Sequence, residues 1–234
     1  MIAGMVKAYP QYVRKLDCGN VVVRTEKKEG KVAQVVVNDD VAVDGSFYTV
    51  GRRGVAGTVF VHKIAGAKAE QGAELEEVQR VAQKVIDNVR TMGVAIRPCT
   101  VPAAGKPGFE LGEDEMEVGI GIHGEPGTHK EKLRPADEIV DHILGKILAD
   151  IDYTGHEVAV MVNSSGATPL MELFIINNHV ADVLAAKGIK VYKTFVGEYM
   201  TSLEMEGFSV SLLRLDDELK ALLGAPADTI AFKV

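Results

Sequence analysis

A single histidine stands among glycines in the segment Glu115–Gly127, which reads EMEVGIGIHGEPG. Apolar residues alternate with glutamates and glycines along this segment, which predicts a strand that ends at His123. Glycines at positions 119 and 121 leave the histidine's face of that strand empty, and Gly124 and Gly127 allow a sharp turn and a close approach of the backbone to a ligand. The segment therefore predicts a small-ligand site beside His123. The same pattern also fits a kinked edge strand that ends in a turn with a solvated histidine.

Three kinds of chemistry are open to His123, because a neutral imidazole can act as a general base, a metal ligand or a nucleophile. A metal site would have to recruit Glu125 and His129, but the spacing H-x-E-x-x-x-H is not a familiar ligand pattern, and the sequence contains no HExxH. Neither a GxSxG elbow nor a cysteine–histidine pair indicates a hydrolase.

Two other charged pairs each allow two interpretations. Asp39 and Asp40 end a run of β-branched residues, where they fit either ligands or turn formers that hydrogen-bond their own backbone. Arg52 and Arg53 stand between glycines, where they fit either a phosphate or carboxylate site or the surface of a tight turn.

Hydrophobic periodicity predicts the elements that position these residues. Apolar residues at spacings of three and four predict helices over residues 73–92, with Gly93 as the stop, over 136–150, and from near Thr168 to Lys187. Runs of β-branched residues predict strands at 32–37, 157–162, 189–196, 208–215 and 229–234. The loop 163–169, NSSGATP, joins a strand to a helix start that can hold an anion, although it lacks a phosphate-binding pattern. Strands that alternate with helices indicate an α/β fold.

Composition narrows the classes of function. The chain has 234 residues, 26 basic against 33 acidic side chains and a net charge of -7, which argues against an electrostatic nucleic-acid binder. No apolar stretch is long enough to predict a membrane span. Cys18 and Cys99 do not resemble a disulfide framework or a metal site, so we expect a cytoplasmic location.

Four segments resemble one known family. GRRGVAGTVFVHKIAGA, CTVPAAGKPGFELGEDEMEVGIGIHGEPG, GATPLMELFI and YMTSLEMEGFSVSLLRLDDE together resemble the substrate-binding subunit of dihydroxyacetone kinase, from about Val35 to the C-terminus. In that family the histidine of GIHGEPG attacks the ketone carbonyl of dihydroxyacetone and holds it as a covalent hemiaminal. The resemblance therefore implies a catalytic role for His123. It also implies that Gly121, Gly124 and Glu125 belong to the substrate site.

The resemblance further implies an α/β protein in two parts. These are a shortened N-terminal α/β domain over residues 1–91 and a complete C-terminal α/β domain, with a mixed sheet flanked by helices, over 92–234. It implies that this chain binds no cofactor directly. ATP and magnesium, or a phosphoryl-carrying chain, would belong to a helical nucleotide-binding kinase subunit. A homodimer is also implied.

One departure from the family pattern concerns the N-terminal part. Members continue after a GKVA-like strand into a loop close to SGGGSGHEP and later carry a KNYTGD segment, which supply a second histidine and an aspartate. Here GKVA, at positions 30–33, passes directly into QVVVNDDVAV. The departure motivates an alternative: a non-catalytic homologue that senses a small carbonyl compound or docks to a partner. A third interpretation is an inactive scaffold that dimerises through the surface left uncovered.

Overall fold

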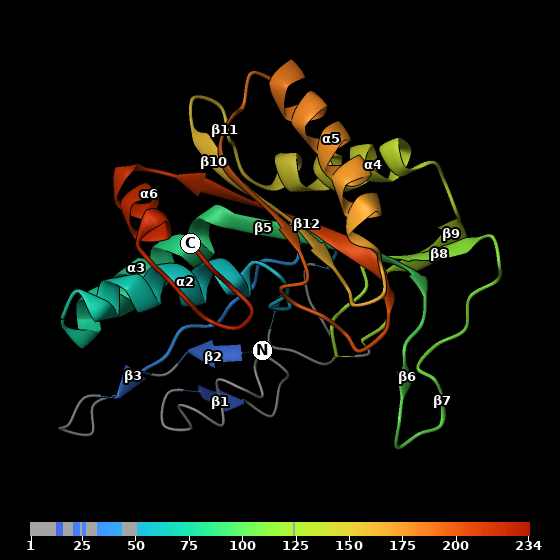
Figure 1. Cartoon of the computed structure of the whole chain (residues 1–234), viewed down its shortest axis with the longest axis horizontal. Helices are drawn as coiled ribbons and strands as arrows, with labels where there is room; N and C mark the ends of the chain where they lie inside the picture. The colour runs from blue at the N-terminus through green and yellow to red at the C-terminus, as the bar shows by residue number, and fades with distance from the viewer. Residues whose placement is uncertain (1–12, 16–20, 24, 27–31, 44–50, 124) are drawn as a thin grey trace.

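A computed structural model describes residues 13–15, 21–23, 25–26, 32–43, 51–123 and 125–234. Its centre is a six-stranded sheet with the strand order β11-β10-β12-β5-β8-β9 (Figure 1). β10 and β11 pair in parallel and all other neighbours are antiparallel, so the sheet is mixed. In chain order its strands are β5 (Val89–Arg97), β8 (Glu115–Val118), β9 (His129–Lys132), β10 (Glu157–Ser164), β11 (Lys190–Gly197) and β12 (Glu206–Leu215).

Helices cover both faces of this sheet, and the predicted mixed α/β fold is thereby confirmed (Figure 1). Alternate residues of β10 enter two different cores: Val160 packs with α4 and α5, and Met161 packs with α2, α3 and α6. Burial on both faces explains why β10 is continuously apolar rather than alternating. The helices are α2 (Thr58–Glu70), α3 (Leu75–Asn88), α4 (Ala136–Asp150), α5 (Leu170–Ala186) and α6 (Asp217–Gly224).

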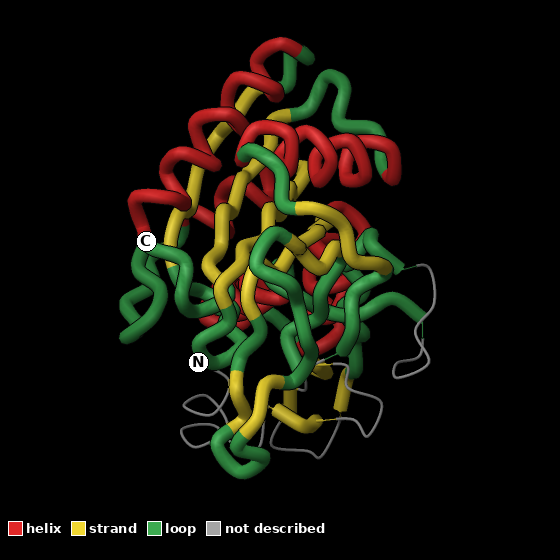
Figure 2. The backbone as a smooth tube through the Cα atoms, turned by 90° about the vertical axis from the view of Figure 1, so that its right-hand side faces the viewer, coloured by secondary structure: helices red, strands yellow, loops and turns green. Residues whose placement is uncertain are grey.

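Three short two-stranded pairs complete the described secondary structure. The hairpin of β6 and β7 extends away from the main sheet (Figures 1 and 2). The pairs are β1 (Val13–Lys15) with β2 (Val21–Val23), β3 (Thr25–Glu26) with β4 (Val32–Ala33), and β6 (Thr100–Val101) with β7 (Lys106–Pro107).

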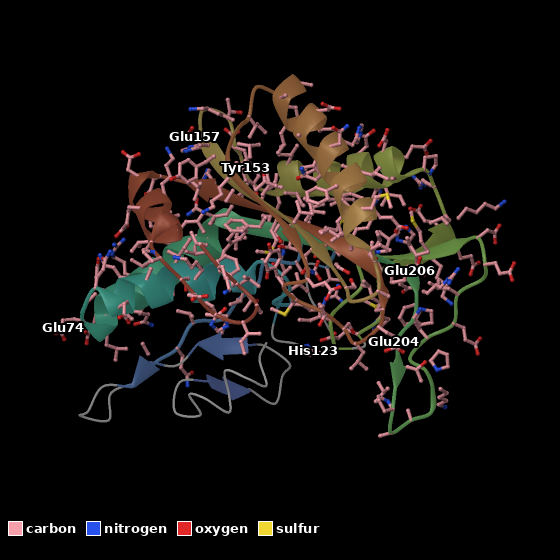
Figure 3. All side chains as sticks on the ribbon, viewed as in Figure 1. Glu74, His123, Tyr153, Glu157, Glu204 and Glu206 are labelled. Carbon is pink, nitrogen blue, oxygen red and sulfur yellow. The ribbon has the colours of Figure 1, made fainter. Side chains whose placement is uncertain are left out.

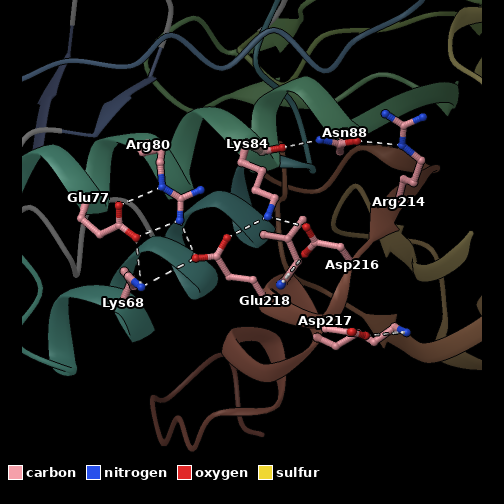
Figure 4. Close-up of polar contacts among 11 residues, drawn as sticks. Lys68, Glu77, Arg80, Lys84, Asn88, Arg214, Asp216, Asp217 and Glu218 are labelled. Carbon is pink, nitrogen blue, oxygen red and sulfur yellow. Dashed lines mark hydrogen bonds and ion pairs between the residues drawn. The ribbon is translucent and has the colours of Figure 1, made fainter.

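An ionic network joins the three helices on one face (Figure 4). Glu218 of α6 accepts hydrogen bonds from Arg80 at 2.5 Å and Lys84 at 2.7 Å, both on α3. Lys68 of α2 lies 3.7 Å from the same carboxylate. Each exposed ion pair contributes little by itself, but the shared carboxylate fixes α6 against both neighbours.

Helix α3 ends earlier than the periodicity predicts, whereas the predicted helix over residues 136–150 coincides with α4. The helix predicted over 73–92 is wrong beyond Asn88, because residues from Val89 onward form β5 and pair with β12. Gly93 is therefore no helix stop. It faces Ser209 across two strands, where an added Cβ would lie 3.0 Å from the carbonyl oxygen of Phe208.

Two predicted strands are also wrong in extent. Of the strand predicted over 32–37, only Val32–Ala33 forms a strand, β4. In place of the final strand predicted over 229–234, the structure has one isolated bridge between Asp228 and Lys233. β5 runs across residues 91 and 92, where the sequence predicts a division into two domains. That division stays a prediction.

The central strand pair generates a test of the sheet. A Cβ on Gly207 would lie 2.3 Å from the carbonyl oxygen of Val94, so we expect Gly207→Ala to lower the free energy of unfolding by about 3 kcal/mol through backbone displacement. Gly145 lies on the exposed side of α4 with no atom within 4 Å of an added Cβ. Gly145→Ala should raise the free energy of unfolding by about 1 kcal/mol. Urea unfolding measures both free energies. A Gly207→Ala variant that is as stable as Gly145→Ala would contradict the close approach of the strands.

Candidate functional site

The histidine of interest lies on a loop and not on a strand. β8 ends at Val118, so the strand predicted to continue to His123 is wrong. Gly119 turns the chain with φ +71°, and a Cβ there would lie 2.4 Å from the Cβ of Ala42. Because a side chain is excluded at this position, the turn requires glycine. His123 follows on the loop between β8 and β9, in the lower half of the view in Figure 3, away from α4 and α5.

Glu125 fixes the histidine from within the same loop. Its Oε2 accepts a hydrogen bond of 2.8 Å from the backbone N–H of His123, and its Oε1 lies 3.3 Å from Nδ1 of the ring. A Cβ on Gly121 would lie 2.4 Å from Oε2 of Glu125. The space predicted beside Gly121 is therefore filled by this carboxylate.

The electrostatics of this pair favour one arrangement of protons. Burial alone would raise the pKa of Glu125, but the hydrogen bonds from the His123 ring and from backbone amides lower it to about 2. An ionised Glu125 accepts a hydrogen bond from Nδ1–H, and this tautomer leaves the lone pair on Nε2 free. The His123 side chain is 32% exposed, so a small molecule can reach the ring.

The buried guanidinium of Arg53 holds the loop that carries His123. Arg53 donates from Nη2 to the carbonyl oxygen of Gly119 at 2.6 Å and from Nη1 to that of Pro126 at 3.1 Å. Its Nε donates to Oδ2 of Asp40 at 2.8 Å. Of the two interpretations of Arg53, the carboxylate site is the one that holds, and the carboxylate belongs to the protein. The sequence leaves the role of Arg53 open, because no local pattern indicates that an arginine is buried.

The neighbouring charged residues also bind within the chain. Asp39 accepts hydrogen bonds of 2.8 Å from the amides of Val55 and Gly57, just before α2. Arg52 makes two hydrogen bonds, of 2.7 and 2.9 Å, to Asp150 at the end of α4. Asp39 and Arg52 therefore each bind another part of the protein and are not exposed ligand-binding groups.

A small pocket lies behind the loop. Gly121 lines it and His123 does not, and Gly124 lies outside the described residues. The amide oxygen of Asn163 in its wall accepts hydrogen bonds of 2.8 Å from the backbone amides of Tyr199 and Met200. The lining residues are Asp40, Val55, Gly93, Ile120, Gly121, Ile122, Asn163, Ser165, Met205, Phe208 and Ser209.

Two features are absent from the described part of the chain. Within it, no three or more His, Cys, Asp or Glu side chains are grouped so that they could hold a metal ion. None of the helices described has the length and apolar character needed to cross a membrane. In the loop 163–169, two hydroxyls donate within the chain: Thr168 Oγ1 to the carbonyl oxygen of Gly207 at 2.6 Å and Ser164 Oγ to that of Thr168 at 3.1 Å.

Comparison with known proteins identifies relatives that agree with one another in family. The Dak1 domain matches residues 15–231. The chain is 53% identical over 204 residues to the dihydroxyacetone-binding subunit of PTS-dependent dihydroxyacetone kinase 1 of Listeria innocua, covering 86% of this chain and 62% of that protein. It is 40% identical over 226 residues to the dihydroxyacetone-binding subunit of the PEP-dependent kinase of Escherichia coli, covering 86% and 64%.

Two solved structures are similar in fold. A dihydroxyacetone kinase operon co-activator matches with a TM-score of 0.76 and 35% identity, over 82% of this chain and 60% of that one. The dihydroxyacetone kinase of C. freundii matches with a TM-score of 0.75 and 31% identity, over 83% and 35%. The chain thus spans less than two thirds of the length of these relatives.

The Glu125–His123 contact predicts a pH dependence of stability. Because the folded-state pKa of Glu125, about 2, lies below its ordinary value of 4.5, the ionised carboxylate stabilises the fold above that value and loses this contribution as the pH falls toward 2. Glu125→Gln should lower the free energy of unfolding by about 2 kcal/mol at pH 7. The difference from wild type should shrink as the pH is lowered.

Urea unfolding of wild type, Glu125→Gln and the control Glu110→Gln across this pH range checks it. Glu110 is exposed, so its replacement should change little at any pH. A difference between Glu125→Gln and wild type that does not change with pH would contradict the assignment.

Proposed function

The chain belongs to the Dak1 family, and from that premise we propose that His123 captures dihydroxyacetone covalently and presents it for phosphorylation by a partner subunit. The observation that carries the proposal is the contact of 3.3 Å between Nδ1 of His123 and Oε1 of Glu125. It leaves Nε2 of an accessible ring as the free nucleophilic atom.

The proposed step is an addition to a ketone. Nε2 of His123 forms a bond to the carbonyl carbon, and the electron pair of the C=O double bond moves to the oxygen, which takes a proton from water. The ring gains positive charge during the attack, and the carboxylate of Glu125 stabilises that charge before the Nδ1 proton leaves to solvent. The product is a neutral hemiaminal. Polyols such as glycerol have no electrophilic carbon, so the site selects short ketones and aldehydes.

The phosphoryl group would come from outside this chain. Two relatives are dihydroxyacetone-binding subunits of PTS- or PEP-dependent kinases, which supports a donor on another subunit. In the proposed assembly, ATP and magnesium, or a phosphoryl-carrying chain, belong to a helical nucleotide-binding partner. A homodimer and a cytoplasmic location are part of the same proposal. Gly121 and Gly124, beside His123 in the sequence, are proposed to contact the substrate.

A second candidate is a sensor of small carbonyl compounds. The likeness to an operon co-activator, at a TM-score of 0.76, favours it. So does the passage of residues 30–33 directly into QVVVNDDVAV, without the segments that supply a second histidine and an aspartate in the family. A sensor would still form the adduct with His123, but it would not support turnover.

Removal of the nucleophile tests the capture step. His123→Ala should abolish the adduct, which native mass spectrometry detects as the added mass of dihydroxyacetone and carbon-13 NMR as a tetrahedral carbon in place of the carbonyl. The control His156→Ala replaces an exposed histidine on the loop before β10 and should leave the adduct unchanged. Binding of dihydroxyacetone by His123→Ala as tightly as by wild type would rule out the covalent role.

A transfer assay separates the two candidate functions. If the chain is a kinase subunit, dihydroxyacetone phosphate should form in a mixture of the wild-type chain, a helical kinase partner, its phosphoryl donor and dihydroxyacetone. Adduct without product would instead support the sensor. His123→Ala in the same mixture supplies the background rate.

A further inference from the structure

One arginine side chain ties together both ends of the loop that carries His123. Arg53 reaches the carbonyl oxygens of Gly119 and Pro126, which stand before and after the histidine in the sequence. Arg53 itself is only 3% exposed. Between the two anchored carbonyls lie the histidine and its partner Glu125, so the guanidinium fixes the chain on both sides of the site.

Asp40 supplies the counter-charge that a buried arginine needs. An unpaired guanidinium would be strongly destabilising there, and the carboxylate of Asp40, which is itself only 1% exposed, carries the opposite charge. Its second oxygen, Oδ1, accepts a hydrogen bond of 2.9 Å from the amide of Ala42. Ala42 in turn packs against Gly119. Asp40 therefore holds both Arg53 and the residue on which the start of the loop rests.

The guanidinium is suited to this task by its shape. Its N–H groups point in fixed directions in one plane, so contacts to two carbonyls and one carboxylate define a single position of the side chain. A lysine at position 53 would keep the charge but would lack the fork that joins Gly119 to Pro126.

We propose that Arg53, oriented by Asp40, is a positioning residue for His123: by fixing the two ends of the loop it sets the His123–Glu125 contact that prepares Nε2 for attack. The effect of Arg53 on catalysis rests on the proposed function of His123. The effect of Arg53 on the position of the loop does not, because it can be measured on the free protein.

Arg53→Lys tests the proposal against the matched control Arg52→Lys. Arg52 precedes Arg53 in the same turn and makes a comparable bidentate pair, but with Asp150 of α4. In free protein labelled with nitrogen-15 histidine, Arg53→Lys should shift the His123 ring signals away from the Nδ1–H tautomer. It should also speed amide hydrogen exchange in residues 119–127 about tenfold, as expected for the loss of one anchoring interaction. Arg52→Lys should change neither.

The adduct supplies the second readout. Arg53→Lys should weaken adduct formation with dihydroxyacetone by on the order of 100-fold, the effect of a small misplacement of a reacting group. If wild type forms no adduct, the proposed function fails, while the ring signals and the exchange rates still decide the role of Arg53. Ring signals and exchange in Arg53→Lys equal to those of Arg52→Lys would overturn the proposal.

Asp40→Asn covers the case in which Arg53→Lys does not fold. Asparagine keeps the shape and one acceptor oxygen while removing the charge, so it should loosen the same loop residues to a smaller degree. Circular dichroism checks the fold of each variant. Unfolding of both Arg53→Lys and Asp40→Asn, with Arg52→Lys folded, would also contradict the proposal, because the pair would then hold the whole fold rather than the loop.

Discussion

Two adjacent buried carboxylates support the site and one neighbouring helix. Asp39 binds the amides that begin α2, while Asp40 pairs with Arg53 beneath the loop of His123. Burial raises the pKa of Asp39, and it raises that of Asp40 to about 6 even with the Arg53 guanidinium beside it. Both charges are tolerable only because several N–H groups point at them. The backbone here is also tied to β5, since the amide of Thr91 donates to the carbonyl oxygen of Asp39 at 2.7 Å.

Regular elements could be predicted where one periodicity dominated. In α4, residues at spacings of three and four, such as Ile139 and Ile143, are buried together, and the predicted limits coincide with the observed ones. The error at the end of α3 has a specific cause: Val89 and Met92 continue the helical spacing but also fit a strand. Pairing with β12 decides in favour of the strand, and such long-range pairing cannot be read from local spacing.

The candidate site could be predicted only in its central residues. The sequence singles out His123 and Glu125 through their place in one motif, and these two side chains do meet. Arg53 lies 66 positions before Gly119, and only the folded chain brings the two together. The glycines predict room for a ligand, yet Gly121 accommodates the carboxylate of Glu125. A glycine pattern indicates a close approach without saying which group approaches.

Capture and turnover place different demands on the protein. Addition to a ketone needs a free ring nitrogen, a group that stabilises positive charge on the ring and access from solvent, all of which His123 and Glu125 can supply. Phosphoryl transfer needs in addition an oriented hydroxyl, and a group that accepts its proton. The carboxylate of Glu125 is engaged with His123, and those of Asp39 and Asp40 are buried in contacts with the backbone and Arg53. None of these three is free to accept that proton, so transfer would require a group other than these three, whereas capture would not.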